Sequence, residues 1–239
     1  MWPEGLKRVS KDSKTVVIVG PRFWVIGQKI DKISVFLVWK IANLNQLQDW
    51  DKREPTSLLK PLNKNKRDLN NNSENTANSV THDHERLDKV KPTASRHLIF
   101  IRHGQYNLEG AADADRYLTL LGRDQAALTG ERLKLLSLPY NRVVYSTMTR
   151  ATETAEIIMS KMDKVDDIES CALLREGAPI PPEPPIGSWR PEMHQFYSDG
   201  ARIEAAFRKH VHRAPVSQEK DSYEVFVCHA NVIRYFVCR

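Results

Sequence analysis

The clearest structural signal in the sequence is the run His97-Leu98-Ile99-Phe100-Ile101, which leads directly into Arg102-His103-Gly104. A short, mostly apolar run that ends in a polar loop with glycine is typical of a strand buried in a parallel sheet. Two later runs have the same character, Val143-Val144-Tyr145 and Val225-Phe226-Val227. We therefore predict three short buried strands.

Segments with helical periodicity lie between these strands. Leucines recur every seven residues within 119–137, and apolar residues three or four positions apart indicate two further helices. Ser146 or Thr147 is suited to cap the second helix. The apolar positions of the three helices are Leu121, Leu128 and Leu135; Ala151, Ala155, Ile158 and Met162; and Ile203, Phe207 and Val211. Alternating strands and helices predict a three-layer α/β fold, with helices on both faces of the sheet.

The chain of 239 residues divides into three regions by composition. Residues 1–59 are a basic N-terminal region, residues 60–95 are rich in Asn, and residues 96–239 are the α/β domain. The Asn-rich segment has too few apolar residues to offset its ordering entropy, so we expect a disordered linker. The three cysteines, Cys171, Cys228 and Cys238, have no C-x-x-C spacing and indicate neither a disulfide framework nor a zinc knuckle.

Positive charge is concentrated in the N-terminal part of the chain. Residues 1–96 contain 18 Lys and Arg against 11 Asp and Glu, whereas residues 97–239 contain 18 against 19. We therefore expect no nucleic acid as a partner of the α/β domain. The apolar runs 15–27 and 33–42 are each shorter than the roughly 20 residues that span a bilayer. Together with the basic residues they are similar to a mitochondrial presequence or a membrane-surface anchor, which predicts a mitochondrial, membrane-associated protein. If the segment is not a targeting signal, the expected location is cytoplasmic.

Two of the predicted strands lead into histidine. Arg102-His103-Gly104 follows the first strand and His229 follows the last, so both imidazoles are expected at the carboxyl edge of the sheet, where ligands of such folds bind. Arg150 lies at the start of the helix after Val143-Val144-Tyr145, and a helix N-terminus already presents N–H groups to an anion. Two arginines, two histidines and a helix start together predict a phosphate clamp.

A phosphate monoester with a poor leaving group also needs a proton donor. A neutral imidazole can act as the nucleophile near pH 7, but a departing serine or threonine alkoxide must be protonated. Glu176 is the candidate acid because it lies in a loop-like stretch, Leu173-Leu174-Arg175-Glu176-Gly177, before a proline-rich segment. The chemistry therefore selects His103 and Glu176 with Arg102, Arg150 and His229.

Three elements of the sequence resemble the histidine phosphatase superfamily, the phosphoglycerate mutase-like fold. They are Arg102-His103-Gly104, the Leu-Thr-x-x-Gly-x-x-Gln-Ala element at 118–126, and the Ser-x-x-x-Arg-Ala-x-x-Thr-Ala element at 146–155, with His229 as the closing histidine. The stretches 173–179, 199–208 and 228–235 are similar to a mitochondrial serine/threonine-protein phosphatase branch of that superfamily.

The resemblance implies a protein phosphatase that needs no metal or other cofactor and acts on phosphoserine and phosphothreonine of a phosphoprotein. It makes His103 the phosphorylated nucleophile, Arg102, Arg150 and His229 the phosphate ligands, and Glu176 the proton donor, with His229 also part of the catalytic set. Arg202 and Glu204 are interpreted as the solvated face of a helix. Two alternatives stay open: a catalytically weak binding or regulatory pseudophosphatase, and a small-molecule phosphatase or mutase.

Three departures from the family pattern shape these expectations. Mutases of the superfamily carry Ser and Asn where this chain has Tyr106 and Glu109, which argues against mutase activity. Of the branch's Trp-Asp-x-Asn-Trp-Asp assembly motif only Trp50-Asp51 remains, so a homo-oligomer built through it is in question. The resembling proteins continue past the position of Arg239, so we expect the last strands of the fold to be missing and the domain at 96–239 to be incomplete.

Overall fold

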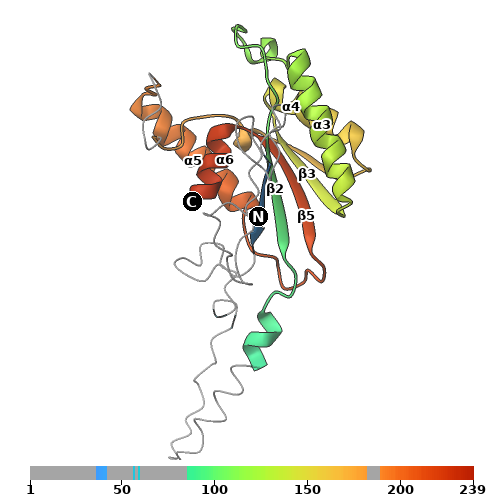
Figure 1. The fold of residues 1–239 in the computed structure, drawn as a ribbon. Coiled ribbons are helices and arrows are strands. Elements are labelled where there is room, and N and C mark those ends of the chain that lie inside the picture. The colour runs from blue at the N-terminus through green and yellow to red at the C-terminus, as the bar shows by residue number, and fades with distance from the viewer. Residues whose placement is uncertain (1–35, 42–55, 57–58, 60–84, 182–188) are drawn as a thin grey trace, which may run out of the picture.

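A five-stranded sheet forms the centre of the computed structural model, which describes residues 36–41, 56, 59, 85–181 and 189–239 (Figure 1). The strands lie in the order β1 (Phe36–Ile41), β2 (Arg96–Arg102), β5 (Ser222–Cys228), β3 (Tyr140–Ser146) and β4 (Asp167–Cys171). β2, β5, β3 and β4 are parallel, whereas β1 pairs with β2 in the antiparallel direction.

Helices cover both faces of this sheet, which confirms the predicted three-layer α/β class. They are α3 (Leu120–Leu136), α4 (Thr149–Lys161), α5 (Met193–His210) and α6 (Ala230–Cys238), with short 3-10 turns η1 (Asp113–Asp115) and η2 (Ala172–Leu174). Figure 1 shows α3 and α4 on one side of the sheet and α5 and α6 on the other. Two apolar clusters follow from this arrangement. Leu98, Phe100 and Phe226 face α5 and α6, while Ile99, Ile101 and Val225 face α3 and α4.

The three predicted strands appear as β2, β3 and β5, whereas β4 and β1 were not predicted. β4 has the sequence DIESC, with two acidic residues and a half-exposed Ile168, so it contains no apolar run from which a buried strand could be predicted. β1 lies inside the apolar run 33–42 of the N-terminal region. Residues 85–90 are helical and belong to the segment predicted as a linker. The rest of that segment, residues 60–84, and the basic residues 1–35 lie outside the described residues, as does Trp50-Asp51.

Among the residues that the structure describes, no helix has both the length and the apolar character needed to cross a bilayer.

The heptad leucines of α3 lie on its solvent face. Leu121, Leu128 and Leu135 are 38%, 43% and 75% exposed, and the buried face carries Gly122, Ala126, Thr129, Gly130 and Leu133 instead. A Cβ atom at Gly130 would lie 2.7 Å from the Ile158 carbonyl oxygen, so the small residues let α3 approach α4 closely. The seven-residue spacing therefore marked the helix correctly but not the face that packs.

Two leucines on this helix should respond very differently to truncation. Leu133 is 1% exposed and Leu135 is 75% exposed. Leu133→Ala should lower the free energy of unfolding by about 2–5 kcal/mol because it opens a cavity between α3 and the sheet. Leu135→Ala should change it by less than about 0.5 kcal/mol. Urea unfolding of the two variants measures both values, and equal losses would contradict the assignment of faces.

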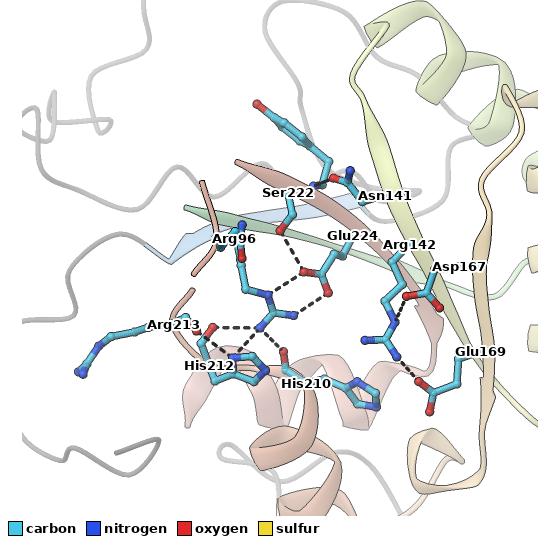
Figure 2. A network of polar contacts seen from close by, with 12 residues as sticks. Arg96, Asn141, Arg142, Asp167, Glu169, His210, His212, Arg213, Ser222 and Glu224 are labelled. Carbon is cyan, nitrogen blue, oxygen red and sulfur yellow. Dashed lines mark hydrogen bonds and ion pairs between the residues drawn. The ribbon is translucent and has the colours of Figure 1, made fainter. Parts of the chain in front are cut away.

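A buried ion pair ties the N-terminal edge of the sheet to the end of α5 (Figure 2). The Arg96 guanidinium donates from Nε and Nη2 to the two Glu224 carboxylate oxygens, at 2.7 and 2.6 Å. Its Nη1 donates to the carbonyl oxygens of His210 and His212, both at 3.0 Å. Arg96 and Glu224 are each 5% exposed, so this pair is enclosed at the edge opposite the two strand-following histidines.

Removing only one member of this pair should be costly. Arg96→Met leaves the Glu224 charge buried and uncompensated, which is expected to reduce the free energy of unfolding by about 3–5 kcal/mol. The double variant Arg96→Met, Glu224→Leu should lose much less because no isolated charge remains. A double-mutant cycle by urea unfolding tests this. Additive losses would show that the two side chains do not act as a pair.

Candidate functional site

The carboxyl edge of the sheet brings the two predicted histidines together. β2 and β5 are neighbours with Arg102 opposite Cys228, and the His103 N–H donates to the Cys228 carbonyl oxygen at 3.1 Å. His103 and His229 therefore leave adjacent strands at the same height, and their ring centroids are 5.2 Å apart. The rings are 7% and 0% exposed, respectively. The two imidazoles lie close together because β2 and β5, although far apart in sequence, are neighbours in the sheet.

Hydrogen bonding fixes the tautomer of His103. Nδ1 lies 2.8 Å from the Gly104 carbonyl oxygen, which can only accept, so Nδ1 carries the proton. Nε2 then bears the lone pair and accepts a hydrogen bond from Nε of Arg150 at 3.2 Å. Burial, aided by the charges of Arg150 and Arg102, lowers the pKa of His103 to about 3. The ring is consequently neutral at pH 7, with the lone pair of Nε2 directed into the space beside Arg150.

Arg150, the second residue of α4, is held on every side. It is 3% exposed, its Nη2 donates to Met148 Sδ at 3.6 Å, and its guanidinium carbon lies 4.6 Å from the centre of the Tyr106 ring. Tyr106 also packs edge-on against His103, with centroids 5.0 Å apart. Asp113 faces the remaining Nη1 at 3.6 Å. These contacts fix the guanidinium next to the lone pair of His103.

Asp113 also caps α4, in place of the predicted Ser146 or Thr147. Its Oδ2 accepts hydrogen bonds from the N–H of Thr149 at 3.2 Å and from the Thr149 hydroxyl at 3.4 Å. The N-cap residue itself, Met148, makes no side-chain capping bond. The cap prediction was wrong because Asp113 is 36 residues away in sequence and arrives through the loop that contains η1.

His229 lies deeper than His103. Its Nε2 is 2.8 Å from the Ser146 hydroxyl, and among the described residues its Nδ1 has no hydrogen-bond partner. Burial, and then the neighbouring His103, Arg150 and Arg102, hold the pKa of His229 far below its ordinary value. Arg175 adds to this positive surround while its Nη1 donates to the Thr147 hydroxyl at 3.3 Å. The ring is therefore a neutral group that can hydrogen-bond an oxyanion.

The Glu176 carboxyl group lies beside these cationic groups. Oε1 accepts from the N–H of Gly177 at 3.2 Å and from the N–H of Asn231 at 3.3 Å. Burial raises the pKa of Glu176, although these two hydrogen bonds and the charges of Arg150 and Arg102 oppose the shift. A carboxyl group with a raised pKa keeps its proton more readily near neutral pH, as a general acid must.

Arg202 secures the loop that carries Glu176. Its guanidinium donates to the carbonyl oxygens of Leu173, Arg175 and Glu176 at 2.9, 2.6 and 3.1 Å, and pairs with Asp199 at 2.8 Å. Glu204, on the same helix, accepts from the Tyr235 hydroxyl at 2.8 Å and from Arg208 and Arg239. The interpretation of Arg202 and Glu204 as a solvated helix face was therefore wrong. Both residues hold α5 to neighbouring segments.

The glycine after His103 allows the start of α3 to pack on the same loop. A Cβ atom at Gly104 would lie 2.5 Å from the Gly122 carbonyl oxygen, and one at Gly122 would lie 1.9 Å from the Gln105 carbonyl oxygen. Neither position has room for a side chain. The Leu-Thr-x-x-Gly element at 118–126 thus serves to seat α3 against the loop that orients His103.

All five predicted site residues lie at one edge of the sheet. Arg102 is exposed at the end of β2, and its charge helps to lower the pKa of His103 and His229 and opposes the rise in the pKa of Glu176. The sequence did not single out Tyr106, Asp113, Ser146 or Arg175 for this site. Ser146 and Arg175 stand inside recognised motifs and could have been found there, whereas Asp113 carries no local signal.

The edge combines positive charge, two neutral imidazoles and a carboxyl group with a raised pKa. Such a set can bind a tetrahedral oxyanion and transfer it to Nε2 of His103.

The family model and the curated relatives that match this chain agree with each other. Residues 98–178 match the model of the histidine phosphatase superfamily, branch 1. The chain is 53% identical over 191 residues to the mitochondrial serine/threonine-protein phosphatase PGAM5 of Rattus norvegicus, and 52% identical over 191 residues to that of Homo sapiens. These matches cover 80% of this chain and 62% of each relative. The chain thus spans less than two thirds of the length of these curated relatives.

Among solved structures, a phosphoglycerate mutase from Plasmodium falciparum is similar with 28% identity and a TM-score of 0.43, over 62% of this chain and 69% of that one.

Proposed function

The chain contains a domain of the histidine phosphatase superfamily, and on this premise we propose that it hydrolyses phosphoserine and phosphothreonine on proteins through a phosphohistidine at His103. The orientation of His103 supports this proposal most strongly. Its neutral ring presents the lone pair of Nε2 beside Arg150, with His229 5.2 Å away, centroid to centroid. The printed names of the relatives describe serine/threonine-protein phosphatases, which gives the substrate class.

In the first half of the proposed reaction, Nε2 of His103 attacks phosphorus and the bond to the serine or threonine oxygen breaks. Arg102, Arg150 and His229 hold the three remaining phosphoryl oxygens and stabilise the charge that spreads over them. Glu176 gives its proton to the departing oxygen. In the second half, a water molecule attacks the phosphohistidine, the Glu176 carboxylate takes a proton from that water, and phosphate leaves with the His103 ring restored.

Tyr106 supports a hydrolase rather than a mutase. Its ring packs on both His103 and Arg150, at a position where mutases of the superfamily carry a small serine. A mutase must hold and reorient a phosphorylated sugar acid after the first transfer. A bulky aromatic ring at this place reduces the room for such an intermediate.

Parallel assays distinguish the candidate functions. The 239-residue chain should release phosphate from a phosphothreonine peptide and should turn over 3-phosphoglycerate far more slowly. Faster turnover of phosphoglycerate would favour the small-molecule phosphatase or mutase. Binding of the phosphopeptide without release of phosphate would favour the pseudophosphatase, and either result would overturn the proposal.

The remaining proposals concern the rest of the chain. We assign catalysis to residues 96–239 and targeting to residues 1–59, with a phosphoprotein as the partner and a mitochondrial membrane surface as the location. The basic N-terminal composition and the word mitochondrial in the names of the relatives support this. A fluorescent fusion of the full chain should mark mitochondria, and deletion of residues 1–59 should abolish that pattern. Assembly into homo-oligomers would have to proceed without an intact assembly motif.

A further inference from the structure

A second group of polar side chains lies where β4 meets the end of α5. Glu169 and Cys171 alternate along β4, on the sheet face covered by α5, and His210 is the last residue of that helix. Figure 2 shows Glu169 and His210 approaching each other from these two elements. One ligand atom from each of the three residues, including Cys171 Sγ, lies within 4.8 Å of the others. We propose that Glu169, Cys171 and His210 form a binding site for a thiophilic divalent cation such as Zn²⁺ or Cd²⁺.

The spacing of the two softer ligands fits such an ion. Cys171 Sγ and His210 Nε2 are 3.5 Å apart. With Zn–S and Zn–N bonds of about 2.3 and 2.0–2.1 Å, a tetrahedral angle places sulfur and nitrogen roughly 3.5 Å apart. The sulfur and nitrogen therefore need little movement to share one ion. A modest shift of the Glu169 side chain would supply a third ligand, and water a fourth.

Both of the softer ligands, His210 and Cys171, are buried. His210 is 1% exposed, and burial, followed by the nearby charges of Lys209, Arg142 and Arg96, lowers its pKa to about 4. The ring is thus neutral at pH 7 and needs to lose no proton. Cys171 is 4% exposed, so it is protected from larger reagents while an ion can approach from the side of the partly exposed Glu169.

Two cations now neutralise Glu169, and their positions define what an incoming ion must displace. Arg142 pairs with Glu169 and also with Asp167, whose carboxylate lies 3.2 Å from Arg142 Nε. Lys209 pairs with the other Glu169 oxygen and is 47% exposed at its side chain. Lys209 can swing into water, whereas Arg142 keeps Asp167 as its counter-ion.

The exchange conserves charge. Before binding, the charges of Glu169 and Lys209 sum to zero. When the ion binds, Lys209 leaves, the Cys171 thiol gives one proton to solvent, and a divalent cation meets one carboxylate and one thiolate. No oxidant or reductant takes part. Lys209 therefore acts as a resident cation that competes with the metal ion.

The test is a titration of the full-length chain with Cd²⁺, following sulfur-to-cadmium charge-transfer absorbance in the ultraviolet. All variants carry Cys238→Ser, because Cys238 is exposed and would bind the ion on its own. We expect one equivalent of Cd²⁺ to produce the band, and Cys171→Ser to abolish it. His210→Gln and Glu169→Gln should weaken binding at least roughly tenfold. Persistence of the band in Cys171→Ser would overturn the site.

Lys209→Gln provides a test that does not depend on removing a ligand. This surface change should tighten Cd²⁺ binding about fivefold, since it removes the cation that competes with the ion for Glu169. Unchanged or weaker binding would overturn the exchange argument. Circular dichroism of each variant shows that the fold is retained, and Lys209→Gln keeps the proposal testable even if Cys171→Ser unfolds.

Discussion

Replacement of His103 by alanine should abolish the acid-labile phosphoenzyme. A phosphorus–nitrogen bond at imidazole survives alkali and breaks in acid, so a labelled phosphopeptide should leave a distinctive trapped species on the unaltered chain. In His103→Ala the lone pair of Nε2 beside Arg150 is lost, and no other described imidazole in this crevice has a ring nitrogen bonded to Arg150. Rapid quench at alkaline pH followed by gel analysis measures the trapped label.

His97→Ala is the matched control for this experiment. His97 is a histidine of the same strand, β2, but it pairs with Asp221 and stacks on Tyr223 at the opposite end, away from the crevice. Labelling should survive this change. His229→Ala should form the phosphoenzyme more slowly, because His229 is proposed to hold a phosphoryl oxygen. Acid-labile label that persists in His103→Ala would assign the nucleophile to another residue.

Glu176→Gln should slow the hydrolysis of phosphothreonine peptides by about 10²–10⁴-fold while sparing an activated aryl phosphate. A threonine alkoxide is a poor leaving group that needs the proton of Glu176, whereas an aryl oxide departs without one. Steady-state rates on both substrates provide the comparison. Gln keeps the shape of the side chain and an oxygen that can accept from the N–H of Gly177 and Asn231. Equal losses on the two substrates would identify a binding or structural role.

The pH profile adds a second readout for Glu176. The acid must be protonated, and burial raises its pKa, so activity on the peptide should fall as pH rises through that value. The Glu176→Gln variant should lose this alkaline limb. His103 sets no acid limb in the neutral range, because its pKa is lowered to about 3 and its ring is neutral well below pH 6. An alkaline limb that remains in Glu176→Gln would belong to another group.

The sequence predicted those strands and helices whose own residues show a clear apolar pattern, and it missed those whose residues do not. The central residues of β2, β3 and β5 are buried on both faces of the sheet, so each strand contains a short apolar run. β4 lies at an edge and is marked by no such run. The start of α5 at Met193 was missed because its first turns, up to Asp199, are mostly exposed and carry few core residues, whereas Ile203 and Phe207 are buried.

The same distinction applies to the site. Catalytic candidates that follow strands could be placed because parallel strands end at a common edge. The residues that hold them could not, since Asp113 reaches α4 across 36 positions and Arg202 reaches three carbonyl oxygens across 26 to 29. Nothing in a sequence window reveals such contacts. An arginine on a helix is interpreted as solvated unless its distant acceptors are known.

The crevice contains buried polar atoms that make no hydrogen bond, which sets the stability of the folded protein against its proposed catalytic activity. Within the described residues, Arg150 Nη1, Asp113 Oδ1 and His229 Nδ1 are buried without hydrogen bonds. Arg150 Nη1 and Asp113 Oδ1 face each other as an ion pair at 3.6 Å, so of these three atoms it is His229 Nδ1 that carries the full cost of an unsatisfied buried group, about 1–3 kcal/mol. The unliganded protein is therefore less stable than its core would permit, and a tetrahedral anion such as vanadate should raise its melting temperature. Selection of variants for heat resistance alone would be expected to enrich apolar replacements at His229, and to yield variants that are more stable but have lost the proposed activity.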